Sequence, residues 1–500
     1  MMLVACSDSS DSRDDDPARL QPQTSPGDTA QTATDTPDTE QVDTRIGKIE
    51  LELGVPTQES AQALFDTMDF QRASQAYLWA LPTVGFEYVL REQREQLGAK
   101  NGDVVIYKGY QGESRFLTAN VTTPYIIGFM DLAESGPMVL EVPAGAIVGS
   151  AMDFWQRPLT DFGVTGPDKG QGGQYLMVGP AQEPPKALPA DVRVVRTPTY
   201  GVGFFYRALD TDPDKVAAME KALRTYPWTE RANPSPTQHI VPTQPQMATL
   251  PQGMAFWEQL AAVIDREPVD GRDRFFVAML RPLGIERGKP FSPNERQRQL
   301  LQQGAQVGEL MAKANSFDKR FSGARYRDDA HWDYLIMADP EQDLEDYSQL
   351  DERAAYFYEA VALSKGMVTK TPGVGQAYLS TYRDAQGHAF DGSKTYRLRV
   401  PADPPAKQFW SVTVYDTGTR GIIQNDQKIA DRSSRQDLVT NDDGSVDIYF
   451  APQAPKGFEN NWIPTVPGRS WFVYFRLYAP LEGYFEQRWP LPDIEAVDKR

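Results

Sequence analysis

Cysteine is almost absent from this 500-residue sequence, in which Cys6 is the only one. A single cysteine cannot close an internal disulfide, so the folded part must be stable without any. Histidine is scarce as well, because His239, His331 and His388 lie far apart and form no His-x-x-x-His or His-x-His pair. Zinc sites use closely spaced histidines and cysteines, and we therefore expect no metal site.

Long apolar runs and nucleotide or nucleophile motifs are also missing. No stretch reaches the ~18 consecutive apolar residues of a membrane-spanning helix, and no Gly-x-Ser-x-Gly pentapeptide marks a serine nucleophile. The glycine-rich "GQGGQ" at 170–174 lacks the Lys-Ser/Thr that completes a phosphate loop. The sequence predicts no cofactor.

The chain is short of positive charge, with a net charge of −18. Such a surface repels phosphates, which argues against nucleic acid or an anionic membrane face as partner and favours a neutral or cationic ligand. Hydrophobic residues make up 40% of the chain, enough at this length for the cores of at least two domains.

The N-terminus has the features of an exported lipoprotein. Leu3-Val4-Ala5-Cys6 resembles a lipobox, where a signal peptide is cut and the cysteine is acylated, so residues 1–6 are interpreted as a truncated signal remnant. Residues 7–46 carry ten carboxylates against three arginines and predict a disordered acidic tether. With Ser7 after the cysteine, we expect a lipid-anchored protein on the periplasmic side of the outer membrane. The alternative is a chance match in a cytosolic N-terminus.

The remaining chain divides into three regions that differ in their predicted secondary structure. Residues 59–210 begin with apolar residues at helical spacing, as two helices broken near Pro82, and continue as short β-rich runs. Residues 211–370 are mainly helical, with an N-cap at Asp212 and a capping box at 292–295. Residues 371–496 return to β-strands. The expected fold class is α+β, mainly β, with two β domains joined by a helical middle.

Several stretches together resemble a bacterial two-domain family, the domains of unknown function 1254 and 1214. The N-terminal half matches through "MDFQRASQAYLWALP" and "LTANVTTPY", and the C-terminal half through "PAKQFWSVTVYD" and "NNWIPTVPGRSWFVYFRLYAP". The resemblance implies two β-sandwich or jelly-roll-like domains, the second similar to domains of carbohydrate-processing enzymes. Where relatives commonly have Asn-x-Asp-Thr-x-Tyr, this chain has Asn120-Val121-Thr122-Thr123-Pro124-Tyr125, without the carboxylate.

Two carboxylates are the weak catalytic candidates. Asp153 lies among aromatic residues, where burial can raise a carboxyl pKa, and Asp416 ends a strand beside Tyr415 and Arg420. As acid and base they could cleave a glycoside if the fold brought them together. In the alternative, each carboxylate holds an arginine or caps a loop.

The ligand-binding candidates lie mainly on two strands with two apolar faces. If residues 408–416 pair with 470–478, one shared face carries tyrosines and an arginine suited to stacking on a sugar or an apolar ligand. The alternative is that packing simply buries this face. The candidates are Tyr415, Arg420, Trp462, Tyr474, Arg476 and Tyr478, with Asn120, Tyr125 and Trp155 from the N-terminal region.

These features predict an envelope lipoprotein that binds or hydrolyses a carbohydrate or other small neutral ligand. The site is expected on the C-terminal β domain or in its cleft with the N-terminal one. The alternative is a non-enzymatic scaffold that docks a partner protein, and a homo-oligomer is compatible with either. Whether the protein is an enzyme stays open at this point.

Overall fold

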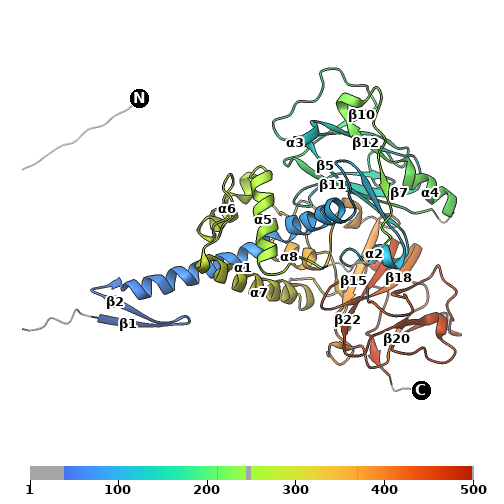
Figure 1. Ribbon diagram of the computed structural model, residues 1–500. Helices are drawn as coiled ribbons and strands as arrows, with labels where there is room; N and C mark the ends of the chain where they lie inside the picture. Colours follow the sequence, from blue (N-terminus) through green and yellow to red (C-terminus); the bar gives the residue numbers. More distant parts are fainter. Residues whose placement is uncertain (1–38, 211, 244–248, 369, 498–500) are drawn as a thin grey trace, which may run out of the picture. The chain divides into compact units, whose positions relative to one another are not determined.

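The computed structural model describes residues 39–210, 212–243, 249–368 and 370–497 (Figure 1). Helices account for 29% and strands for 28% of the structure, and the sheets of the described part are open. The prediction of a fold with both helices and several β-sheets is confirmed, whereas a mainly β, jelly-roll-like fold is not. Two compact units divide between Leu64 and Phe65.

The first unit contains a small antiparallel sheet. Its strands are β1 (Thr39–Thr44), β2 (Gly47–Glu52) and β3 (Val55–Pro56). Gly47 has φ +110°, a conformation that glycine adopts without strain in the turn between β1 and β2. This hairpin corrects the C-terminal limit of the predicted tether, since residues 39–46 form a strand and its turn. Cys6 and residues 7–38 lie outside the described residues.

Helix α1 (Gln58–Arg91) continues through Pro82, so the predicted break there is wrong. A proline lacks the N–H that would donate to the carbonyl four residues earlier, here that of Leu78. Side chains from other segments donate to two neighbouring carbonyls: Arg353 Nη2 to that of Trp79 at 2.7 Å, and Gln156 Nε2 to that of Pro82. Tertiary contacts therefore hold the helix on both sides of the lost hydrogen bond.

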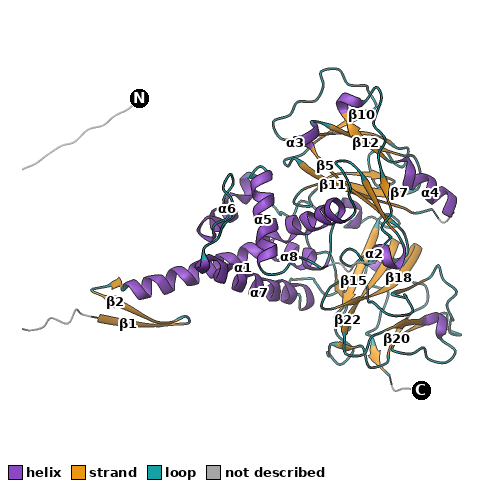
Figure 2. Ribbon diagram, viewed as in Figure 1, coloured by secondary structure: helices purple, strands orange, loops and turns teal. Residues whose placement is uncertain are grey.

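The middle of the chain is helical, as Figure 2 shows. Its longer helices are α4 (Pro213–Ala222), α5 (Met254–Arg266), α6 (Arg274–Leu280), α7 (Glu295–Phe317) and α8 (Leu350–Glu359). Asp212 caps α4 as predicted. The capping box of α7 is formed by Asn294 and Gln297 rather than by residues 292 and 295, because the helix begins two residues later than expected. Short helices elsewhere are α2 (Gly109–Glu113), α3 (Leu132–Ser135) and α9 (Glu482–Phe485).

Two sheets form the N-terminal β region. The larger has the order β13-β4-β5-β11-β7-β8, with β4 (Val104–Tyr107), β5 (Tyr125–Asp131), β7 (Ile147–Asp153), β8 (Pro158–Gly163), β11 (Gly201–Ala208) and β13 (His239–Ile240). The smaller has the order β10-β9-β6-β12, with β6 (Met138–Val142), β9 (Gly173–Val178), β10 (Val192–Arg196) and β12 (Arg224–Pro227). A shared apolar cluster of residues from β4 to β11 packs between them.

Two further sheets form the C-terminal β region. One has the order β14-β15-β22-β18-β19, with β16 also on β22: β14 (Asp333–Tyr334), β15 (Gln376–Thr381), β16 (Phe390–Asp391), β18 (Ala406–Asp416), β19 (Asp431–Ser433) and β22 (Ser470–Pro480). The other has the order β21-β20-β17-β23, with β17 (Tyr396–Val400), β20 (Val446–Ala451), β21 (Trp462–Pro464) and β23 (Glu495–Ala496). The predicted pairing of 408–416 with 470–478 is confirmed, because β18 and β22 are antiparallel with Ser411 opposite Arg476.

The largest apolar core joins α1, the middle helices and the C-terminal strands, from Ala73 to Ile494. The predicted domain limits at residues 210 and 370 stay a prediction, since residues 65–500 form one compact unit. Across the described residues, none of the helices combines the length and apolar character that a bilayer crossing requires.

Candidate functional site

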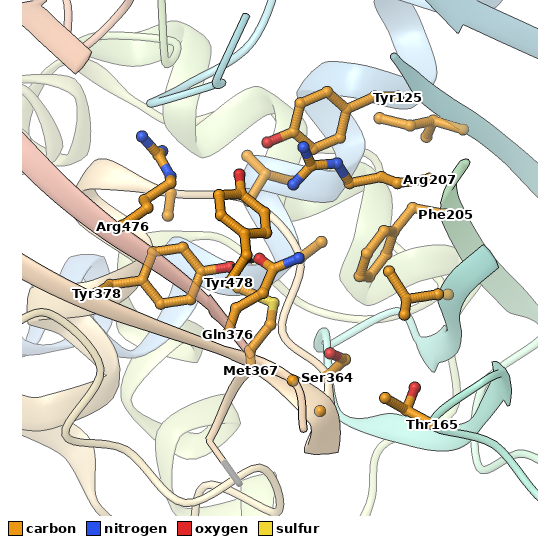
Figure 3. Close-up of a pocket in the computed structure, with 18 of the residues that line it drawn as sticks. Tyr125, Thr165, Phe205, Arg207, Ser364, Met367, Gln376, Tyr378, Arg476 and Tyr478 are labelled. Carbon is orange, nitrogen blue, oxygen red and sulfur yellow. Dashed lines mark hydrogen bonds between the residues drawn. The ribbon is translucent and has the colours of Figure 1, made fainter. Parts of the chain in front are cut away.

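A cavity of about 400 Å³ lies between the N-terminal and C-terminal β regions (Figure 3). Strands β5 and β11 contribute to its wall on one side, and β15 and β22 on the other. Because side chains alternate along a strand, residues two apart face the cavity together, as in the set Phe205 and Arg207 or the set Tyr474, Arg476 and Tyr478.

Most of the wall is apolar. The larger apolar side chains that line the cavity include Phe86, Val89, Phe116, Leu117, Ile127, Phe129, Val148, Met152, Phe204, Phe205, Leu209, Leu335, Val361 and Met367. The Phe86 and Phe129 rings meet edge to face with centroids 5.4 Å apart. Val164 and Val374 also line the cavity and are 47% and 41% exposed, so they mark its mouth.

Arg207, which is 3% exposed, lies in a cradle made by the Asn120–Tyr125 segment. Its Nη2 donates to Asn120 Oδ1 at 2.9 Å and to the Thr123 hydroxyl, and its guanidinium carbon lies 4.6 Å from the Tyr125 ring centroid. The Asn, Thr and Tyr of the family pattern all contact this arginine, whose guanidinium carbon also lies 5.8 Å from the Tyr478 ring centroid. The motif therefore positions a buried cation.

Arg476 is the second buried arginine of the cavity and is also 3% exposed. Its Nη1 donates to Thr413 Oγ1 at 3.0 Å and its Nη2 to the Thr118 carbonyl at 2.8 Å. The guanidinium carbon lies 5.2 Å from the Tyr474 ring centroid and 5.7 Å from that of Tyr378. A guanidinium stays protonated in proteins, so both arginines are cations.

The tyrosines around these arginines are neutral hydrogen-bonding groups. Burial raises the pKa of Tyr378 and of Tyr474 well above the usual value near 10. Tyr378 donates to Gln376 Oε1, and Tyr474 donates to Glu359. The Tyr478 hydroxyl, by contrast, makes no hydrogen bond of good geometry with any described residue. In the view of Figure 3 it lies between the guanidinium groups of Arg207 and Arg476.

Two carboxylates lie behind this polar part of the wall without lining it. Glu359 is fully buried and accepts from the hydroxyls of Tyr382, at 2.6 Å, and of Tyr474. Asp431 accepts from the Thr122 hydroxyl at 3.3 Å. Burial raises the pKa of Asp431 to about 6, although Arg432, the Thr122 hydrogen bond and the charge of Arg476 oppose the rise.

Of the nine predicted ligand-binding residues, four line the cavity: Tyr125, Tyr474, Arg476 and Tyr478. Two others stand behind them. Asn120 holds Arg207, and the Tyr415 hydroxyl donates to the carbonyls of Thr118, at 3.1 Å, and Ala119, at 2.7 Å.

The other three predicted residues lie away from the cavity. Arg420 stacks over the Tyr358 ring at 4.2 Å, Trp462 donates to the Ala451 carbonyl at 2.8 Å, and Trp155 packs with its ring centroid 4.6 Å from that of Trp79. Each of these contacts is made within a packed part of the fold.

Asp153 and Asp416 also lie away from the cavity, and each accepts hydrogen bonds from an arginine and from backbone amides of the loop that follows it. Asp153 accepts from Arg157 Nε at 2.6 Å and from two backbone amides, and Asp416 accepts from Arg469 at 3.1 Å and from the amides of Gly418 and Thr419. These contacts agree with the alternative interpretation, in which each carboxylate holds an arginine or caps a loop.

Arg207, Tyr378 and Gln376 were missed by the sequence interpretation. Arg207 was detectable in principle, because it is the one charged residue in the otherwise apolar "GVGFFYRA" of β11, every residue of which is buried. Tyr378 and Gln376 carried no such signal, since only the pairing of β15 with β22 places them opposite Arg476 and Tyr478. In the described part, no group of three or more His, Cys, Asp or Glu residues is arranged to hold a metal ion.

Comparison with known structures supports this fold. The crystal structure of the VPA0106 protein from Vibrio parahaemolyticus superimposes with a TM-score of 0.55 at 19% identity, covering 86% of this chain and 100% of that one. An uncharacterised protein from Burkholderia cenocepacia gives a TM-score of 0.39 at 11% identity, covering 88% of this chain and 97% of that one. None of the curated proteins matches the sequence significantly.

Two family models match the sequence, and both are described as proteins of unknown function. DUF1254 matches residues 104–227, which hold β5, β11 and Arg207, and DUF1214 matches residues 375–482, which hold β15, β22 and Arg476. Each therefore supplies one side of the cavity. The two regions are present in the order that the sequence resemblance predicted, DUF1254 followed by DUF1214.

Proposed function

We propose that this protein binds a small organic molecule with a large apolar part in the cavity between its two β regions. The observation that carries the proposal is the cavity itself, at about 400 Å³ and lined mainly by apolar side chains. Protein interiors are close-packed, and small-molecule sites are hollows of roughly 300–1,000 Å³ with few polar groups. A cavity of this kind is suited to a ligand.

The lining favours an apolar ligand over a carbohydrate. A sugar presents hydroxyls on all sides, whereas the charged side chains of this cavity are Arg207 and Arg476 alone, and most of the remaining wall is aromatic or aliphatic. Thr165 and Ser364 add two hydroxyls away from the arginines (Figure 3). Hydrolysis by a carboxylate pair has no support in the described lining, which contains neither Asp nor Glu. Binding is therefore the function that we propose, with no reaction assigned.

Attachment to the cell envelope is part of the proposal. It depends on the sequence Leu3-Val4-Ala5-Cys6 alone, because Cys6 lies outside the described residues. Labelled palmitate should enter the full-length protein expressed in a bacterium, and the variant Cys6→Ser should remain unlabelled. Equal labelling of both would contradict acylation at this cysteine.

Binding can be tested with the neutral fluorescent probe N-phenyl-1-naphthylamine. We expect its emission to rise on binding to the wild-type protein, and the rise to disappear in Met367→Trp, because the larger side chain fills the cavity that Met367 lines. The control is Met311→Trp, at a 39% exposed position on α7 that does not line the cavity. Unchanged probe binding in Met367→Trp would contradict the site.

A further inference from the structure

The cavity has an unusual charge pattern. Among the described residues that line it, the only charged side chains are Arg207 and Arg476, and both are positive. Neither forms an ion pair with a described carboxylate, and their hydrogen bonds go to neutral oxygens of Asn120, Thr123, Thr413 and Thr118. Burying a cation without a counter-charge carries a desolvation free energy of roughly several kcal/mol, which hydrogen bonds to neutral acceptors only partly offset.

Two other buried arginines of the same chain have carboxylate partners. Arg115, 4% exposed, forms an ion pair with Glu92, and Arg157, 3% exposed, forms one with Asp153. Arg353, 4% exposed, forms no ion pair with a described carboxylate and donates to the Trp79 carbonyl, so Arg207 and Arg476 differ from all three because they also line the cavity. The missing partner is then expected from outside the chain.

Three polar atoms beside these cations lack a hydrogen-bond partner of good geometry, and one of them, the Tyr478 hydroxyl, faces the Arg207 guanidinium. Nε of Arg207, Nε of Arg476 and the hydroxyl of Tyr478 are buried, and none makes a hydrogen bond of good geometry with a described residue. Tyr478 is 1% exposed, so bulk water does not serve as its partner. The Tyr125 hydroxyl accepts from the Asn120 amide nitrogens, at 3.0 and 3.3 Å, which leaves its own proton free to donate.

We infer that the ligand is an organic anion, a carboxylate with an apolar body, bound with its carboxylate between Arg207 and Arg476. This inference rests on the proposed function and names the ligand class of the same cavity. A carboxylate accepts several charge-assisted hydrogen bonds, and guanidinium groups are its preferred partners. The apolar body lies against the aromatic and aliphatic wall around Phe86, Phe129 and Phe205.

The acidity of the whole chain does not oppose this assignment. Net charge acts at long range and is screened by salt over about 8–10 Å, whereas the two arginines act at contact distance in a site with little water. The net charge of −18 led to the expectation of a neutral or cationic ligand. The two arginines of the cavity instead favour an anionic one.

Three probes of one chain length test the inference: octanoate, 1-octanol and octylammonium, titrated calorimetrically into the full chain at equal salt. We expect octanoate to bind on the order of 100-fold more tightly than 1-octanol, because only the carboxylate pairs with the arginines, and octylammonium to bind least. Equal affinity for octanoate and octanol would overturn the anion assignment while leaving the proposed function in place. Binding of none of the three, with no N-phenyl-1-naphthylamine signal, would overturn both.

Variants of the cavity residues test where the carboxylate of the ligand binds. Arg476→Met should remove most of the preference of octanoate over octanol, and Arg298→Met, at an exposed position on α7, should leave it unchanged. Tyr478→Phe is the milder variant, since it keeps the ring that stacks on Phe409 at 3.8 Å and deletes only the unpaired hydroxyl. We expect it to unfold like the wild type and to bind octanoate about tenfold more weakly. Unchanged octanoate affinity in both Arg476→Met and Tyr478→Phe would refute the inference.

Discussion

At the residue scale, Asn120 explains how Arg207 remains buried in its place. Its Oδ1 accepts from Arg207 and from the amides of Thr122 and Thr123, and its Nδ2 donates to the Tyr125 hydroxyl. One fully buried amide thus fixes both the loop and the cation.

The variant Asn120→Ala should therefore be costly. It leaves a buried guanidinium and two loop amides short of acceptors, and we expect the free energy of unfolding to fall by about 3 kcal/mol. Urea denaturation measures this, with Asn233→Ala as the control, because Asn233 is exposed. A loss below about 1 kcal/mol would show that Arg207 does not depend on this cradle.

Asp431 makes the stability of the protein depend on pH. Its carboxyl titrates near 3.8 when exposed and near 6 in the fold, since burial disfavours the charged form. The folded state binds the proton more tightly, so this residue stabilises the fold most below pH 4 and progressively less as the pH rises to about 6. At about 1.36 kcal/mol per pKa unit, the difference is about 3 kcal/mol.

Replacing Asp431 with Asn should remove this dependence. The gain in stability of Asp431→Asn over the wild type should be small at pH 4 and rise to its full value above pH 6, when measured by urea unfolding across the range. A difference between the two proteins that does not change with pH would contradict the raised pKa.

At the element scale, the sheet that contains β7 and β11 requires glycine where aromatic side chains pack closely against its backbone. A Cβ on Gly149 of β7 would lie 2.1 Å from the Phe162 ring and 2.6 Å from the Phe205 carbonyl. The second neighbour is backbone of β11, which pairs with β7, so it cannot move without distorting the sheet.

We therefore expect Gly149→Ala to lower the free energy of unfolding by about 3 kcal/mol, as overpacking does. Gly271→Ala is the matched control, because a Cβ there meets nothing within 4 Å. The control should change stability by less than about 1 kcal/mol in either direction. Similar denaturation midpoints for the two variants would refute the tight contact.

Element-scale prediction from sequence worked where the pattern extended over a whole strand. The two-faced pattern of β18 and β22 predicted which side chains would share a face if the two strands paired, and the structure pairs them. It failed at Pro82, where a rule for isolated helices was overridden by donors from residues far away in the sequence.

At the scale of the whole molecule, the C-terminal β region shares its core with α1 and the middle helices. Residues 371–500 alone would expose the apolar side chains that those helices cover. We expect this fragment to be insoluble or to lack a cooperative unfolding transition, while residues 58–500 should fold, since they contain the second compact unit entirely. A soluble, cooperatively unfolding fragment 371–500 would contradict the shared core.

The sequence by itself determined the resemblance to DUF1254 and DUF1214, the presence of both helices and strands, and the strand face that carries Tyr474, Arg476 and Tyr478, because these follow from local patterns. Only the tertiary structure decided which candidates meet. It brought Arg207 to the same cavity as Arg476 and left Asp153 and Asp416 away from it, each bound to an arginine. The physical reason is that a binding site depends on distances between strands far apart in sequence, which no local periodicity encodes.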